Sequence, residues 1–239
     1  MTEKAPSIDL AAWLQTPPGR HLLAWEQAQV DAAVVDLFGF HALQLGLPEL
    51  DGLQANRMPH RWLAGRDVLC EFDALPFESA SLDLVLLPHA LELACDAHAL
   101  LREVERVLRP EGRLIVFGLN PASLWGLRQN LGRLRRRGEP YLPRDGEFIG
   151  YWRLRDWLQL LSFDVEAARF GVYRPPMRSE AWLHRWRWID GDQDMQDIWN
   201  ILLAEAVLSL QLQGETIEVF DDTAREKRIS DEMMRRIRG

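Results

Sequence analysis

The feature that most constrains the fold is a pair of apolar segments separated by one amphipathic segment. The first reads LDLVLLP (82–88), the second reads RLIVFGL (113–119), and nearly every position of both is apolar. Strands of this kind are buried on both faces, as in parallel sheets that helices cover on both sides. The sequence therefore predicts a parallel strand pair inside an α/β sheet.

The segment between these strands, DAHALLREVERVLRPEG (96–112), is predicted to be the crossover helix. Asp96 is a suitable N-cap, and Pro110 with Gly112 is expected to end the helix. One helical face carries the apolar residues Leu100, Leu101, Val104, Val107 and Leu108. A strand, a helix and a second strand in this order form a right-handed parallel unit.

Further strands are expected on both sides of this unit. HALQLGL (41–47) and DVLCEFDALPF (67–77) precede it, and HRWLAG (60–65) is a candidate remnant of another strand between them. A helix, YWRLRDWLQLL (151–161), and a strand, FDVEAARFGVY (163–173), follow it. Strands that alternate with helices favour a mostly parallel sheet with helices on both faces.

The two ends of the chain are expected to add helices and a last strand. A short helix over 7–15 is predicted to stop at a Pro-Pro-Gly turn (17–19), and a second helix is predicted over 21–38 with Gly39 as its cap. Residues 207–213 alternate as a strand does, but they also continue a helical face. We expect a helix that gives way there to a final edge strand.

The predicted organisation has four parts. An N-terminal helical layer (1–40) precedes an α/β core (41–175), which a lid helix rich in Trp and Arg and a final strand (176–213) follow. The remaining residues, 214–239, mix both charges with few apolar side chains and are predicted to be a mobile tail.

The charge of the chain limits its partners. A formal net charge of −8 and a pI near 5.3 argue against a protein that coats nucleic acid. The basic stretch RQNLGRLRRRG (128–138) is interpreted as a solvated loop or helix end, so a nucleic-acid partner is not favoured. In MRSEAWLHRWRWID (177–190) Trp and Arg alternate, which suits stacking on bases, binding of an acidic acceptor, or packing as a lid, and we prefer the lid.

Nothing in the sequence indicates a membrane or a metal. No segment approaches the roughly 20 apolar residues that span a bilayer, and the first ten residues lack the pattern of an export signal. A cytoplasmic location without a membrane partner is expected. Cys70 and Cys95 lack the spacing of a zinc site or a redox pair, so they are predicted to be buried thiols.

The block from residue 73 to 118 resembles a known family. Its elements are Asp73-Ala74-Leu75-Pro76-Phe77, then Asp83 near the start of an apolar strand, then Leu101-Arg102-Glu103 and Val107-Leu108-x-Pro110-x-Gly112. This order is similar to the class I S-adenosylmethionine-dependent methyltransferases of the type 11-like branch. FGFHALQLG (38–46) and GLNPASLWGLR (118–128) are similar to an uncharacterised proteobacterial subgroup of that superfamily. The resemblance implies a Rossmann-like methyltransferase sheet.

The resemblance also implies a cofactor, S-adenosyl-L-methionine, and the residues that bind it. In the family the turn after the third strand lies beside the adenine, which points to Asp73, Ala74 and Leu75. The turn after the fourth strand lines the methionine end, which points to Pro88, His89 and Ala90. The turn after the first strand points to Leu45, Gly46 and Leu47. Such sites lie beyond the carboxyl ends of parallel strands, where the strand order reverses.

The region before this block is shorter than the family pattern requires. Only 26 residues separate Gly46 from Asp73, whereas a complete strand–helix–strand unit takes roughly 30 or more. The glycine-rich loop keeps Gly46 alone at the turn, and no acid ends the 60–65 segment, with Asp67 and Glu71 as weak substitutes. Glu49 and Asp51 are interpreted as helix caps. The affinity for S-adenosylmethionine is therefore left open.

Two functions remain as hypotheses. The first is methyl transfer to an unidentified acceptor, with His89 as the candidate catalytic base. Glu92, three residues on, is expected either to orient His89 or to face solvent. A structural histidine packed against the following helix is an equal alternative, and Asn120-Pro121 is interpreted as a turn. The second hypothesis is a noncatalytic relative that binds a protein or nucleic-acid partner. The oligomeric state is not predicted.

Overall fold

The computed structural model describes residues 10–121, 123, 125, 148–172, 180–185 and 207–214. Its helices are α1 (Leu10–Leu14), α2 (Pro17–Val34), α3 (Ala90–Leu93), α4 (Ala97–Val107), α6 (Tyr151–Leu160) and α7 (Glu180–Arg185). Its strands are β1 (His41–Gln44), β2 (His60–Leu63), β3 (Leu82–Pro88), β4 (Leu108–Leu119), β5 (Phe163–Gly171) and β6 (Val207–Gly214). The predicted α/β fold with a mostly parallel sheet is confirmed.

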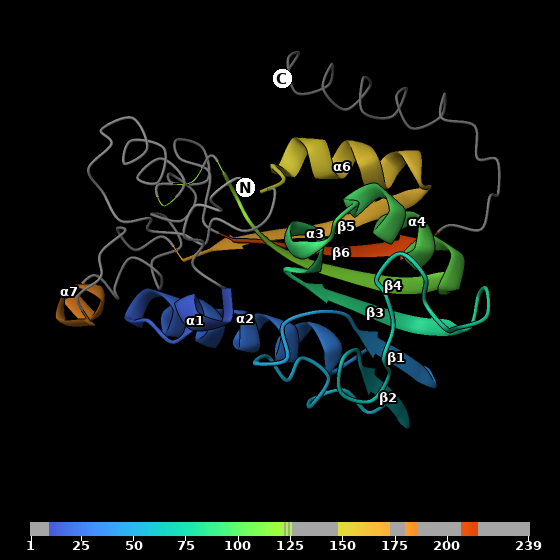
Figure 1. Cartoon of the computed structure of the whole chain (residues 1–239), viewed down its shortest axis with the longest axis horizontal. Helices are drawn as coiled ribbons and strands as arrows, with labels where there is room; N and C mark the ends of the chain where they lie inside the picture. The colour runs from blue at the N-terminus through green and yellow to red at the C-terminus, as the bar shows by residue number, and fades with distance from the viewer. Residues whose placement is uncertain are drawn as a thin grey trace, which may run out of the picture.

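The six strands form one sheet in the order β2-β1-β3-β4-β6-β5 (Figure 1). β1 pairs in parallel with β2 and β3, and β3 pairs in parallel with β4. β6 is antiparallel to both of its neighbours, β4 and β5. The chain leaves β1 toward β2 on one side and continues through β3 on the other, so the strand order reverses between β1 and β3.

Helices cover both faces of the sheet, and alternate residues of the central strands face each layer (Figure 1). Leu84 and Leu86 of β3 pack into a core shared with α1 and α2. Val85 and Leu87 pack into a second core shared with α4 and α6. Because every second side chain enters a different core, both faces of β3 are apolar, as the sequence indicated.

The crossover unit is formed as its local signals predict. Asp96 caps α4, since its carboxylate accepts bonds from the N–H groups of His98 at 2.9 Å and Ala99 at 3.0 Å. The helix ends earlier than expected, at Val107, and the residues around Pro110 belong to the irregular start of β4. Glu111 has a positive φ of 65° there, which lets the chain turn into the strand without a separate loop.

The second helix, α2, starts and ends earlier than predicted. Pro17 and Pro18 form the first turn of α2, and the Thr16 hydroxyl accepts a bond from the Gly19 N–H at 3.4 Å. Proline suits this place because the first helical N–H groups have no partner within the helix. The predicted turn at 17–19 is therefore wrong. The helix ends at Val34, so Gly39 is not its cap.

Two strand predictions are also wrong. The segment 67–77 contains only isolated bridges, Ala64 to Val68 and Glu71 to Ala74, instead of a strand. The last strand, β6, lies inside the sheet, and β5 is the edge strand on that side. By contrast, the candidate remnant at 60–65 forms β2.

Several other expectations concern side chains and segments outside the sheet. Cys70 is half-buried and Cys95 is exposed, so the prediction of buried thiols is wrong for Cys95. In the described part of the chain, no helix has both the length and the apolar character needed to cross a membrane. The basic stretch at 128–138, the start of the helix predicted over 7–15 and the tail from 215 onward lie outside the described residues, as does most of 177–190.

Candidate functional site

The turns that follow β1 and β3 meet at the point where the strand order reverses. Gly46 has a φ of 89°, and a Cβ atom on it would lie 2.9 Å from the Pro88 carbonyl oxygen and 3.3 Å from the Ala90 Cβ. Only glycine allows both this φ and this close approach. The structure thus brings together Gly46 and the Pro88–Ala90 turn, two of the three segments that the family resemblance assigned to the cofactor.

One buried side chain, Gln44, organises the loop after β1. Its Nε2 donates to the carbonyl oxygens of Gly46 at 3.3 Å, Leu47 at 3.1 Å and Leu50 at 2.8 Å. Its Oε1 accepts from the Gly52 N–H at 3.1 Å. The loop has no helix between β1 and β2, so a single amide satisfies backbone groups that a helix would have paired internally.

The loop lies directly on the sheet. A Cβ atom on Gly52 would come within 2.2 Å of a Leu86 methyl carbon, which shows how closely the backbone approaches β3. Leu45 and Leu47, both predicted to contact the cofactor, are 0% and 4% exposed and pack into the two cores. Their side chains support the loop from below, so only their backbone groups remain for a ligand.

A cavity of about 410 Å³ opens beside this loop, at the carboxyl ends of β1 and β2. It is lined by Gln44, Pro48, Leu50, Asp51, Leu53, Gln54, Arg61, Trp62, Leu63 and Arg66. The lining combines apolar side chains with one carboxylate and two guanidinium groups. Its volume lies within the range of small-molecule sites, and its lining is more polar than that of most such sites.

The end of β2 carries charges that are already paired. Gly65 turns the chain with a φ of 87°, and the Asp67 carboxylate then accepts the Leu63 N–H at 2.9 Å. Arg66 donates to the same carboxylate from two nitrogens, each at 3.1 Å. The Arg66 and Leu63 bonds hold the pKa of the Asp67 carboxyl below its usual value. Asp67 therefore completes its own turn, as expected of a weak substitute for a ligand-binding acid.

His89 lies at the centre of a buried ionic cluster. Its Nδ1 is 2.8 Å from Glu92 Oε2, and its Nε2 is 2.9 Å from Glu26 Oε1. The three side chains are 0%, 5% and 0% exposed. Of the two alternatives for Glu92, the structure shows contact with His89 and not exposure to solvent, and Glu26 on α2 is a second partner that the sequence analysis missed.

The cluster keeps His89 protonated. Burial by itself lowers the pKa of His89, but the facing carboxylates of Glu26 and Glu92 outweigh this effect and raise the pKa well above its ordinary value. Both ring nitrogens then donate to carboxylates, so neither is open to accept a proton from a substrate. This geometry favours the structural alternative for His89, and its role as a base stays a prediction.

The third predicted segment, 73–75, lies away from the cavity lining. Asp73 and Ala74 are exposed in a tight turn in which the Ala74 N–H donates to the Glu71 carbonyl at 3.2 Å. Leu75 is 5% exposed, and its N–H donates to Glu103. The place of Asp73 beside an adenine therefore also stays a prediction.

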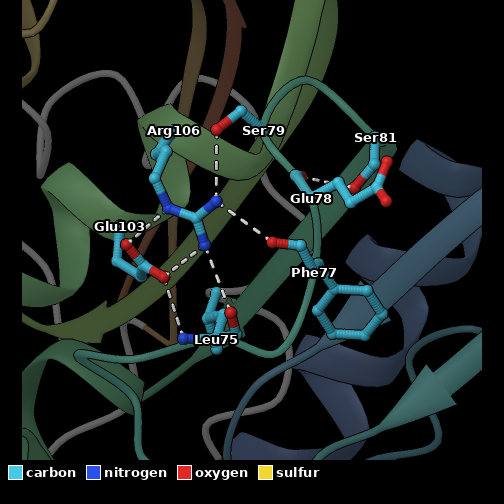
Figure 2. A network of polar contacts seen from close by, with 7 residues as sticks. All are labelled: Leu75, Phe77, Glu78, Ser79, Ser81, Glu103 and Arg106. Carbon is cyan, nitrogen blue, oxygen red and sulfur yellow. Dashed lines mark hydrogen bonds and ion pairs between the residues drawn. The ribbon is translucent and has the colours of Figure 1, made fainter.

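The turn that contains Leu75-Pro76-Phe77 is fixed by two charged residues of α4 (Figure 2). Arg106 donates to the carbonyl oxygens of Leu75 at 3.2 Å and Phe77 at 3.0 Å, and to the Ser79 hydroxyl at 3.2 Å. Glu103 accepts the Leu75 N–H at 2.9 Å and pairs with Arg106 at 2.5 Å. The motif residues thus hold the loop onto the helix.

Asp83 has a similar architectural role at the other end of the strands. Its Oδ2 accepts the N–H groups of Phe40 at 2.8 Å and His41 at 2.9 Å, and its Oδ1 pairs with Arg109 at 2.8 Å. These bonds join the starts of β1, β3 and β4. The aspartate that the resemblance singled out therefore aligns strands rather than binding a ligand.

The functional residues that the sequence analysis missed differ in whether the sequence carries a signal for them. Glu26 stands in the apolar stripe of α2, between Leu22 and Val30 at spacings of four, and a lone acid in such a stripe was a signal of a buried charge. Gln44 and the cavity-lining residues Asp51 and Arg66 gave no such signal, because their surroundings depend on contacts made after folding.

Comparisons with known proteins agree with this architecture. A family model described as "Methyltransferase domain" matches residues 53–116. The uncharacterized protein YafS of Escherichia coli is 34% identical over 167 residues, which cover 67% of this chain and 68% of YafS. The uncharacterized protein Rv2003c of Mycobacterium tuberculosis is 30% identical over 178 residues, 69% of this chain and 61% of that protein.

Solved structures share the fold at low sequence identity. A Haloferax volcanii methyltransferase, solved in complex with the Trm112 methyltransferase activator, has a TM-score of 0.56 and 14% identity, with 88% of this chain and 98% of that chain covered. The [4+2]-cyclase SpnF has a TM-score of 0.53 and 12% identity, with 81% of each chain covered. At such identities the likeness concerns the fold, which hosts more than one chemistry.

Proposed function

Since the chain belongs to the class I S-adenosylmethionine-dependent methyltransferases, we propose that it binds this cofactor at the carboxyl ends of β1, β2 and β3. The observation that carries the proposal is the cavity of about 410 Å³ beside the loop after β1. It lies next to the reversal of the strand order, where open parallel sheets bind their ligands. The loop whose residues 48–54 line the cavity begins at Gly46, which packs against the Pro88–Ala90 turn.

The residues around the cavity fit the chemistry of an adenosyl group. Asp51 supplies a carboxylate that would accept bonds from ribose hydroxyl groups, in place of the acid that β2 lacks at its end. Leu50, Leu53 and Leu63 supply apolar surface for the ring system. Asp73 and Ala74 are proposed to lie beside the adenine, as the resemblance implies. We therefore propose Asp51 as a ligand-binding residue in addition to those that the resemblance implies.

In methyl transfer the protein itself takes little part in the covalent chemistry. The bound cofactor supplies the methyl group in an activated form, on a sulfonium centre. The chain supplies alignment, which can contribute roughly 7–11 kcal/mol through proximity alone. His89, engaged on both ring nitrogens, is assigned to hold the Pro88–Ala90 turn against Gly46.

Thermal unfolding with S-adenosylhomocysteine tests the proposal. Ligand at about 100 times its dissociation constant should stabilise the protein by about 2.7 kcal/mol, which raises Tm by roughly 5–10 °C for a chain of this size. Asp51→Ala and Asp73→Ala should each reduce the shift. Glu49→Ala, two residues from Asp51 and outside the cavity lining, is the matched control and should keep it. No shift at millimolar ligand would reject the cofactor site.

A noncatalytic relative is the second candidate. The observation that favours it is the loop after β1, which lacks a helix and lies on the sheet instead of standing above it. Such a protein would keep the sheet and bind a protein or nucleic-acid partner. It would show no thermal shift with the ligand in either the wild-type chain or the Asp51→Ala variant.

A further inference from the structure

Three charged side chains are buried directly behind the turn between β3 and α3. Glu26 comes from α2, His89 from the turn itself and Glu92 from α3. Each ring nitrogen of His89 faces one carboxylate oxygen, at 2.8 and 2.9 Å. No side chain of the three is more than 5% exposed. We call these residues the ionic cluster.

The ionic cluster carries more negative than positive charge. Glu92 is hydrogen-bonded at both oxygens, because its Oε1 also accepts the Leu119 N–H. Glu26 Oε1 accepts from His89, while its Oε2 is buried and has no hydrogen-bond partner among the described residues. Two carboxylates therefore face one imidazolium. Among the described residues, no other cation forms an ion pair with either carboxylate.

An excess charge of this kind is costly unless it serves a purpose. A buried ionised group without full compensation destabilises the fold, and apolar residues of similar size would often be at least as stable. His89 also has a φ of 55°, a left-handed conformation that non-glycine residues adopt at some cost. A buried net charge and a strained backbone at one turn indicate a functional role for that turn.

The turn packs against the start of the loop that lines the cavity. Ala90 lies against Gly46, with its Cβ 3.3 Å from the position a Cβ would have on that glycine, and residues 48–54 of the same loop line the cavity. The His89 N–H donates to the Phe117 carbonyl at 3.0 Å, which fixes the turn to the end of β4. The ionic cluster is therefore fixed to the turn on which this loop packs.

We propose that the ionic cluster makes the site selective for a positively charged cofactor, so that Glu26 favours S-adenosylmethionine over S-adenosylhomocysteine. The proposal rests on the function proposed above. The two compounds differ by one methyl group and one positive charge, the charge of the sulfonium. A buried negative charge attracts the sulfonium through a medium of low dielectric constant and leaves the neutral thioether unaffected. Loss of the methyl group would then itself weaken binding and assist product release.

Calorimetric titration of both compounds tests this selectivity. Glu26→Gln keeps an oxygen that can accept from His89 and removes one negative charge. We expect S-adenosylmethionine to bind about tenfold more weakly to this variant, as a loss of one nearby charge interaction predicts, and S-adenosylhomocysteine to change by less than about threefold. Glu105→Gln, the same substitution at an exposed position of α4, is the matched control and should change neither affinity.

The possible outcomes separate the two proposals. Equal weakening of both compounds would mean that Glu26 acts through packing alone, and unchanged affinities would mean that it has no role, so either result overturns the selectivity while the cofactor site stands. A wild-type chain that binds neither compound overturns both proposals. If Glu26→Gln does not fold, the wild-type chain decides: it should bind an analogue with a protonated amine in place of the sulfonium more tightly than the neutral thioether, and the reverse order overturns the proposal.

Discussion

Residues 73–119, which include β3 and β4, and residues 44–67, which include the loop after β1, are held in place by different means. In the first region several charged side chains, among them Glu103, Arg106 and Asp83, tie loops and strands to the same scaffold. In the second region the single side chain of Gln44 bonds four backbone groups of one loop. The region that most resembles the family therefore serves mainly to hold the fold together. The loop beside the cavity is held by a different set of hydrogen bonds, those of Gln44.

The difference teaches how far a family motif reaches. Asp83 and Leu75 were singled out by the resemblance, yet their bonds go to backbone and to α4 instead of to the cavity. The cavity lining comes from 44–54 and 61–66. A strong motif match here specifies the sheet, and the ligand site must be argued from the shorter region. The following predictions test whether the two regions differ as described, from the largest expected effect to the smallest.

The largest effect is expected from Gln44→Leu. The change removes the amide and leaves buried backbone groups of Leu50 and Gly52 without the partner that Gln44 provides. Each unpaired buried group costs about 1–3 kcal/mol, so we expect a loss of about 3–4 kcal/mol in the free energy of unfolding, measured with denaturant. Gln54→Leu, at an exposed position of the same loop, should stay within about 0.5 kcal/mol of wild type. Equal effects would contradict the special role of Gln44.

Arg106→Ala should cause the next largest loss in the free energy of unfolding. It removes the bonds to the Leu75 and Phe77 carbonyls and to Glu103. Because its side chain is 38% exposed and water can replace part of these bonds, we expect a loss of about 2 kcal/mol. Arg102→Ala, an exposed arginine on the same helix, is the control. If the motif residues do not hold the loop in place, Arg106→Ala and Arg102→Ala will have the same free energy of unfolding.

The pH dependence of stability should report the ionic cluster. The pKa of His89 is raised in the folded state, so its stabilisation is complete below the unfolded value near 6.5 and is lost as the pH rises through the folded value. Between pH 7 and 8 this group should lower the free energy of unfolding by up to about 1.4 kcal/mol. His89→Gln should flatten that slope, whereas His60→Gln, at an exposed position, should keep it. If the free energy of unfolding changes with pH in the same way in the wild-type, His89→Gln and His60→Gln proteins, then the His89 imidazolium does not cause the pH dependence.

The smallest effect is expected from Asp96→Ala. The change removes the N-cap of α4 and its bonds to His98 and Ala99. Loss of such a cap costs about 1 kcal/mol. Glu105→Ala on the same helix, exposed and away from the cap, should change stability by less than about 0.5 kcal/mol. If Asp96→Ala lowers the free energy of unfolding as much as Arg106→Ala does, then the N-cap contributes as much to the stability of α4 as its contacts with the 75–79 loop.

Sequence reasoning succeeded where the deciding interactions are local. The apolar strand at 82–88 and the capped start of the helix at 97 are formed by neighbouring residues, and both were predicted where the structure has them. The Pro-Pro-Gly segment misled because proline begins a helix as readily as it ends one, and only the Thr16 cap distinguishes the two cases.

The failures involve contacts between distant parts of the chain. Residues 67–77 contain strand-like side chains, but no neighbouring strand pairs with them beyond isolated bridges. The partner of His89, Glu26, is 63 positions away in the sequence. The place of β6 between β4 and β5 follows from two pairings that no local pattern specifies. Pairing partners of this kind depend on topology, which one sequence leaves open.

The place of β6 has a consequence for the order in which the chain is synthesised. The slot between β4 and the edge strand β5 is filled by residues 207–214, which leave the ribosome after all the other strands that the structure describes. Until they arrive, β5 has no strand beside it and β4 presents a bare apolar edge, the kind of surface on which nascent chains aggregate. Completion of the fold therefore waits for one late, long-range insertion, and folding is expected to be limited by that step.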